Sequence, residues 1–261
     1  MRTAILAYRR LQRLVVPERH MVSRFIAANL PGALPAHGLC LDIGAGSTPF
    51  EAALTKAVPG LRQVPVDVIA NDTTQIVADA LLLPFRPGTA GLACFFQVLS
   101  HLPDPPRALA EARRALMPNG CLLIAYPLLY PQGRSQDLWR WTRPGMEHLL
   151  DQAGFDVVAH QTQGGIASYF IATLAQIPGR LLIAHRQGWR SGRGGGDALR
   201  LGLAFLLALP FHLLGFPAWL IDRLCDRDPA FYIGAMVLAR RRGGNLPCGT
   251  EPPQCSSMDA G

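Results

Sequence analysis

The residues best suited to bind a charged ligand lie in and around a short glycine loop, LCLDIGAGSTPF, at residues 39–50. An apolar strand precedes Gly44-Ala45-Gly46 and a helix start follows, so the backbone can approach a ligand and offer it free N–H groups. Asp42 stands just before the loop. Its carboxylate would repel a pyrophosphate but suits a ligand that carries an ammonium and a sulfonium group. The loop therefore predicts S-adenosylmethionine as its ligand.

Two further acids follow the next two apolar runs. Asp67 ends QVPVDV, where a carboxylate can accept hydrogen bonds from both ribose hydroxyls. Asp79 follows in IVADALLLPF, where it can accept from the adenine amino group while Ala80 supplies backbone contacts. Each acid alone is typical of a turn or a cap, but three acids at the ends of successive strands favour one adenosyl ligand. We expect Val68 and Gln97 to complete the cofactor contacts.

Residues that could act on the methyl acceptor follow the fourth and fifth predicted strands. Methyl transfer requires an acceptor in line with the methyl group and an acceptor lone pair free of its proton. His101 is a candidate base, or alternatively a capping or packing histidine. In DLWRWT, Asp137 and Arg140 form either an acceptor clamp or a structural ion pair that orders a lid, with Tyr126 and Tyr130 lining the same mouth. No cluster with the spacing of metal ligands is found, so no metal is expected.

Short apolar runs alternate with helical segments over most of the chain, which predicts an α/β fold with a doubly wound sheet. Helices are expected at 104–117, after the N-cap Asp104, and at 143–153, between Thr142 and Gly154. Strands are expected near 39–43, 62–66, 75–78, 92–97, 120–126, 155–160 and 231–239.

Four stretches together resemble the type 11 class I methyltransferases, especially a bacterial subgroup associated with glycan and cell-envelope synthesis. They are LDIGAGSTPF, VADALLLPF, FFQVLSHLPDPPRALAEARRALMPNGCLLIAYP and DLWRWTRPGMEHLLDQAGF. The similarity covers residues 35–160 and the final strand FYIGAMVLARR. It implies a Rossmann-like, seven-stranded sheet whose last strand is antiparallel, with S-adenosylmethionine at the carboxyl edge.

Three departures from the family pattern matter. Only 12 positions separate Asp67 from Asp79, so the helix between them is expected to be absent or reduced to one turn. Gly91 replaces the usual acid that opens the fourth strand, and Ser100 replaces the acid of the VLEHL pattern. Cofactor binding is compatible with these changes, whereas a shared catalytic base is not carried over.

The regions outside the methyltransferase domain (35–160 and 231–240) have a different composition. Residues 1–34 predict basic amphipathic helices, and residues 241–261 predict a disordered tail. Residues 161–230 form an insert between the sixth and seventh strands, with apolar arms at 165–177 and 201–221. The stretch between the arms contains five arginines and a single acid, in a chain of net charge +7.

The second arm, 201–221, has no acid, lysine or arginine and is long enough to cross a bilayer. A single span is excluded because both ends of the insert belong to one sheet. The first arm has only thirteen residues, and Pro210 and Pro217 interrupt the second. We therefore expect the insert to lie in or against an anionic inner leaflet. The alternatives are a helical subdomain packed on the sheet and a dimer contact.

These patterns favour a cytoplasmic S-adenosylmethionine-dependent methyltransferase, peripheral or monotopic at the inner membrane face, that acts on a membrane-associated or lipid-linked acceptor such as a glycan intermediate. The alternatives are a soluble small-molecule methyltransferase whose insert is a lid or dimer interface, and a cofactor-binding protein without catalysis. Nucleic acid is not expected as a partner, because the sheet carries no basic-aromatic strip. The identity of the acceptor atom and the oligomeric state are left open.

Overall fold

A computed structural model describes residues 17–34, 38–129, 136–183 and 232–243, together with separate positions of the second arm at 203, 206–211, 213–214, 217–218 and 220–222. The predictions made for residues 1–16, for Tyr130 and for most of the tail lie outside the described residues.

A seven-stranded sheet in the order β3-β2-β1-β4-β5-β7-β6 forms the centre of the molecule. Strands β1 to β5 pair in parallel, and β7 is antiparallel to both β5 and β6. The fold class and all seven predicted strands are thus confirmed. The strands are β1 (Leu39–Ile43), β2 (Arg62–Asp67), β3 (Ile76–Val77), β4 (Ala90–Phe96), β5 (Leu116–Pro127), β6 (Phe155–Gln163) and β7 (Gly234–Arg241).

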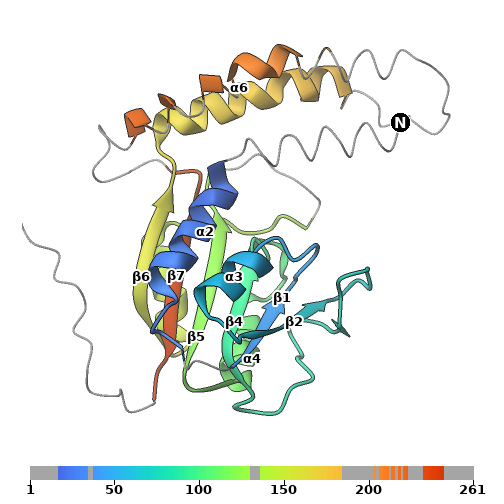
Figure 1. The fold of residues 1–261 in the computed structure, drawn as a ribbon, viewed down its shortest axis with the longest axis vertical. Helices are drawn as coiled ribbons and strands as arrows, with labels where there is room; N and C mark the ends of the chain where they lie inside the picture. Colours follow the sequence, from blue (N-terminus) through green and yellow to red (C-terminus); the bar gives the residue numbers. More distant parts are fainter. Residues whose placement is uncertain are drawn as a thin grey trace, which may run out of the picture.

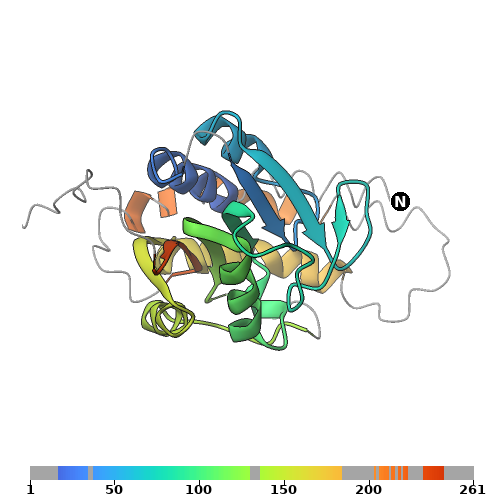
Figure 2. The same ribbon diagram turned by 90° about the horizontal axis from the view of Figure 1, so that it is seen from below.

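Helices cover both faces of this sheet (Figures 1 and 2). Helices α2 (Pro17–Asn29) and α3 (Glu51–Ala57) lie on one face, and α4 (Pro105–Ala115) and α5 (Arg143–Gln152) lie on the other. A 3-10 turn, η1 (Leu99–His101), follows β4. This is the doubly wound arrangement that the alternation of strands and helices predicts.

The two predicted helix starts are capped as expected. The Asp104 carboxylate accepts from the Arg107 backbone N–H at 3.1 Å, and the Thr142 hydroxyl accepts from the Gly145 N–H at 3.2 Å. Helix α4 ends two residues earlier than predicted, because Leu116 already pairs with Ala90 as the first residue of β5.

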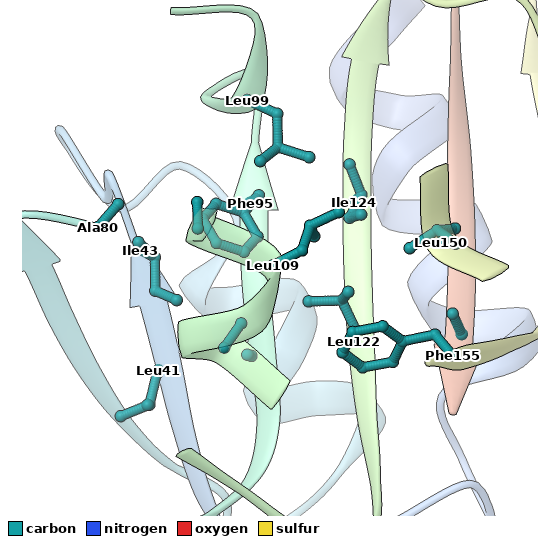
Figure 3. Close-up of a cluster of buried hydrophobic side chains, with 14 of the residues drawn as sticks. Leu41, Ile43, Ala80, Phe95, Leu99, Leu109, Leu122, Ile124, Leu150 and Phe155 are labelled. Carbon is teal, nitrogen blue, oxygen red and sulfur yellow. The ribbon is translucent and has the colours of Figure 1, made fainter. Parts of the chain in front are cut away.

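Apolar side chains pack on each face of the sheet to form two buried clusters. The cluster under α4 and α5 is shown in Figure 3, where Phe95, Leu109 and Ile124 meet between strand and helix. The opposite cluster includes Phe25 of α2 and Leu54 of α3. Burial of each such side chain stabilises the fold by about 1.5–3 kcal/mol, so the sheet that positions the site is rigid. As expected of small core residues, three cysteines are buried as free thiols: Cys40, Cys94 and Cys121.

The insert leaves the sheet at the carboxyl edge of the parallel strands. Because β5 and β6 are both antiparallel to β7, they run in the same direction, and the end of β6 lies at the edge where β1, β2, β4 and β5 also end. Helix α6 (Ile166–Ile183) starts there and lies lengthwise across this end of the sheet (Figures 1 and 2). The insert therefore leaves the sheet at the same edge at which the sequence places the cofactor.

The residue directly after the second arm of the insert holds the start of α6. Asp222, which is 7% exposed, accepts hydrogen bonds at 2.9 Å from the backbone N–H groups of Gly165, Ala167 and Ser168. These groups lack partners within the helix, and a carboxylate also suits the positive end of the helix dipole. Among the described residues, no helix combines the length and the apolar character needed to cross a membrane.

Candidate functional site

The glycine loop is tied to the neighbouring strand and leaves open space above one glycine. The N–H groups of Gly44 and Ala45 donate to the Val66 carbonyl at 2.8 and 3.1 Å. Gly44 has φ +73°, and a Cβ there would lie 2.5 Å from a methyl carbon of Val98, so only glycine fits. Gly46 has φ +54°, and its Cβ position has no atom within 4 Å. The loop thus packs on its inner side and is open on its outer side, as a ligand-binding loop requires.

Asp67 lies beside this loop, as its position in the sequence predicts. Its two carboxylate oxygens accept from the N–H groups of Gly46 and Ile69, each at 3.0 Å. A carboxylate has about four acceptor positions, so further lone pairs can receive two hydroxyl groups. The carboxylate is half-buried beside the glycine loop, and its role as the ribose ligand stays a prediction.

The connection from β2 to β3 contains no helix, which confirms the expectation drawn from the 12-residue spacing. An Asx turn forms instead, in which the Asn71 side chain accepts from the Thr73 N–H at 2.9 Å. The Thr73 hydroxyl then donates to the Gly46 carbonyl at 2.5 Å. Sequence reasoning missed this support, although the NDTT stretch is a recognisable turn signal. Val68, at the start of the connection, is 68% exposed.

The adenine end of the predicted pocket is formed where β3 ends. The Ala78 N–H donates to the Asp67 carbonyl at 3.0 Å, which sets the two strand ends side by side. Asp79 is exposed, and one of its oxygens accepts from the Leu81 N–H at 2.9 Å. Ala80 is buried in the core under α4. The second and third predicted acids are therefore at adjacent strand ends.

Asp42 differs from the other two acids because it is buried beneath the loop, with 1% exposure. The Gln63 side-chain amide donates to its carboxylate at 2.8 Å. Burial raises the pKa of Asp42 to about 7, although the Gln63 hydrogen bond opposes that rise. A nearby cation would favour the ionised form. No sequence motif could have identified Gln63 as the partner of Asp42.

Gln97, the last predicted cofactor residue, adopts an uncommon backbone conformation at the end of β4. Its φ is +60°, and its N–H donates to the Ala125 carbonyl at 2.8 Å. Non-glycine residues in this region of φ are rare and cluster at binding sites. The conformation turns the chain so that Val98 meets the glycine loop.

The predicted lid is docked on the η1 turn. The backbone N–H groups of Leu138 and Trp139 both donate to the Ser100 carbonyl, at 2.8 and 3.2 Å. The Trp139 indole N–H donates to the Leu102 carbonyl at 2.8 Å. His101 is exposed, with its Nδ1 3.2 Å from the Gln136 carbonyl. When Nδ1 carries the proton and donates to this carbonyl, Nε2 is left as a proton acceptor.

Asp137 and Arg140 form a two-pronged ion pair within the lid. Both guanidinium Nη atoms donate to the carboxylate, and the second of these bonds is 2.6 Å long. The Asp137 side chain is 5% exposed, whereas that of Arg140 is 27% exposed. This geometry matches the structural ion pair of the two interpretations. The acceptor clamp stays a prediction.

Tyr126 does not line the mouth of the site, contrary to our expectation. It is fully buried, and its hydroxyl lies 2.7 Å from His160 Nε2. His160 Nδ1 in turn lies 2.9 Å from the Glu147 carboxylate. Because a carboxylate only accepts hydrogen bonds, a neutral His160 donates through Nδ1 to Glu147 and accepts a hydrogen bond from the Tyr126 hydroxyl at Nε2. Burial lowers the pKa of His160, which favours this neutral form.

Comparisons with known proteins agree with this arrangement. A family model described as a methyltransferase domain matches residues 18–160, more than half of the chain. A malonyl-acyl-carrier-protein O-methyltransferase of Alcanivorax borkumensis is 32% identical over 155 residues, covering 54% of this chain and 52% of that protein. The chain therefore matches only about half the length of this curated relative.

Two solved structures share the fold. A methyltransferase of Burkholderia thailandensis with bound 1,6-didemethyltoxoflavin and S-adenosylhomocysteine has a TM-score of 0.50 at 16% identity, covering 86% of this chain and 78% of that one. The cyclase SpnF has a TM-score of 0.52 at 18% identity, covering 86% and 81%. At these identities the likeness is one of fold alone. Together with the family model, it places this chain in the methyltransferase domain family, the class I fold that uses S-adenosylmethionine as methyl donor.

Proposed function

We propose that this chain is an S-adenosylmethionine-dependent methyltransferase whose acceptor is membrane-associated or lipid-linked. The residues of the carboxyl edge fit the cofactor. Asp67 is positioned to hold the ribose hydroxyls, Asp79 and Ala80 border the adenine side, and Gly46 leaves space for the backbone to approach the ligand. When bound, S-adenosylmethionine supplies an electrophilic methyl group on a sulfonium.

The protein's remaining task is to place the acceptor and remove its proton. Backbone hydrogen bonds from Leu138 and Trp139 to Ser100 join the lid to η1 beside the end of β4. His101 lies within η1, and its Nε2 can accept a proton from a hydroxyl or amine acceptor. Positioning contributes much of the rate enhancement in a transfer of this kind, so the base need not be strong.

The apolar composition of helix α6 is the observation that supports a lipid-linked acceptor. Helix α6 begins at the carboxyl edge and extends across it, and residues 166–177 include no acid, lysine or arginine. An acceptor that approaches the carboxyl edge beside α6 meets exposed apolar side chains, which suit a lipid chain better than a free polar metabolite. A soluble small acceptor is the second candidate, because the Burkholderia methyltransferase that shares the fold has the small molecule 1,6-didemethyltoxoflavin bound.

The test is transfer of label from methyl-labelled S-adenosylmethionine to membrane and soluble extracts of the source cells. We expect label to enter material that organic solvent extracts from the membranes. The Asp67→Ala variant, run in parallel, should show no transfer. Label found only in soluble small molecules would contradict the lipid-linked acceptor and favour the second candidate. If the parent protein transfers no more label than the Asp67→Ala variant to either fraction, the proposal that this chain is an enzyme is contradicted.

A further inference from the structure

Helix α6 carries a stripe of exposed apolar side chains. Ile166, Phe170, Leu174 and Ile177 follow one another at intervals of three and four residues, which places them on one face of a helix. Their side chains are 45%, 57%, 38% and 42% exposed. A helix that packs only against its own protein normally buries such a stripe, so this face has no partner among the described residues.

The second arm extends the same kind of surface. Of the twenty large apolar side chains exposed among the described residues, twelve lie in the insert, and eight of these belong to the second arm. Leu206 and Leu213 are the most exposed of them, at 63% and 70%. So many exposed apolar side chains in two segments of one insert mark an interaction site rather than ordinary scatter. We define the docking surface as the α6 stripe together with these second-arm residues.

Charge decides which partner this surface fits. Neither 166–177 nor 203–221 contains an acid, a lysine or an arginine, whereas the connecting residues 178–200 contain five arginines and one aspartate. An apolar surface joined to a basic segment complements the interface of an anionic bilayer. A second copy fits less well, because a symmetric contact would bring two such basic segments together.

We propose that the docking surface lies in the interfacial zone of an anionic bilayer, with α6 in the membrane plane and the carboxyl edge of the sheet turned towards the lipid. At 1.5 Å per residue, its 18 residues make α6 about 27 Å long, which is enough to lie along the surface. This role of the docking surface rests on the proposed function, because membrane docking serves catalysis only when the methyl acceptor is lipid-linked. Docking would bring a lipid-linked acceptor to the cofactor without extracting it from the membrane.

Vesicle flotation with the full chain tests the surface directly. We expect the protein to float with phosphatidylcholine vesicles that contain phosphatidylglycerol, and to float less with phosphatidylcholine alone or at raised salt. In the Phe170→Ser/Leu174→Ser variant, affinity for the anionic vesicles should fall by about tenfold or more. The matched control is Val157→Ser/Val158→Ser, which removes two exposed apolar side chains of β6 and should bind like the parent.

Three results would overturn the docking proposal. They are absence of flotation at any lipid charge, equal flotation of the α6 variant and the parent, and a dimer that the α6 variant dissociates while neither protein binds vesicles. Thermal unfolding and cofactor titration of the α6 variant, both expected to match the parent, show that the protein is folded. Methylation of detergent-solubilised lipid without vesicle binding contradicts docking alone, whereas vesicle binding without methylation of any lipid contradicts the proposed function alone.

Discussion

At the scale of single residues, Asp67 is the side chain on which cofactor affinity should depend most. Asp67→Ala removes the acceptor that we propose for two ribose hydroxyls, together with the acceptor for the N–H groups of Gly46 and Ile69. Hydrogen bonds to a charged group contribute about 1.5–3 kcal/mol each, so the affinity for S-adenosylmethionine should fall at least about tenfold. Isothermal calorimetry measures the change. Asp72→Ala, in the same connection, is the control, and an equal effect of both variants would refute the assignment.

Asp42 predicts a pH dependence of cofactor binding. Its pKa is raised to about 7, so below that pH the carboxyl group is mostly protonated and neutral. A cationic ligand favours the ionised form, so binding releases a proton and affinity should rise with pH until about 7 and then level off. The Asp42→Asn variant should lose this slope and bind more weakly above pH 7. Calorimetry in buffers of different ionisation enthalpy detects the proton, and a flat profile in the parent chain would contradict this role.

At the scale of elements, the lid depends on its internal ion pair. Arg140→Ala removes the guanidinium partner of the nearly buried Asp137, which should lower the free energy of unfolding by about 1–3 kcal/mol. Cofactor affinity should stay close to that of the parent, because the lid contacts η1 rather than the glycine loop. Chemical denaturation and cofactor titration measure the two quantities. If only kcat falls and stability does not, Arg140 acts on the acceptor instead.

The hydrogen-bonded chain from Tyr126 through His160 to Glu147 joins β5, β6 and α5. Tyr126→Phe leaves His160 Nε2 buried without its donor, so the unfolding free energy should drop by about 1–3 kcal/mol. Tyr169→Phe on α6 is the control and should have a smaller effect. Denaturant titration measures the stability of both variants. Equal stabilities would show that the hydrogen bonds among Tyr126, His160 and Glu147 contribute little to the free energy of unfolding.

Apolar runs and turn residues were sufficient to predict the sheet, because most residues of the central strands β1, β4, β5 and β7 are buried, and such strands appear in the sequence as continuous apolar runs. The placement of Gly46 beside Asp67 was also predictable, since parallel strands end at one edge. The contact of Gln63 with Asp42 was not, because one amide on a neighbouring strand carries no pattern. Tyr126 was misread for the related reason that its partner His160 lies 34 residues away.

At the scale of the whole molecule, Asp222 connects the second arm to the sheet through α6. Asp222→Ala leaves three N–H groups at the helix start without their acceptor and should destabilise that end by about 0.5–2 kcal/mol. Hydrogen exchange should then increase over the first turn of α6 while the sheet stays protected. Asp156→Ala, which removes only an exposed ion pair with Arg242, is the control. Equal protection of α6 in both variants would show that the cap is not what holds the insert.

The register of β6 against β7 has a consequence for how this chain can change. Gln163, the last residue of β6, pairs directly with Gly234, the first residue of β7, so the strand ends that flank the insert are neighbours across one antiparallel ladder. The insert therefore occupies the position of the loop in a hairpin formed by β6 and β7. Lengthening such a loop costs little free energy. We therefore expect that another segment can replace the insert without disrupting the sheet. Recombination or design can replace the insert while the strands of the methyltransferase sheet keep their order and spacing.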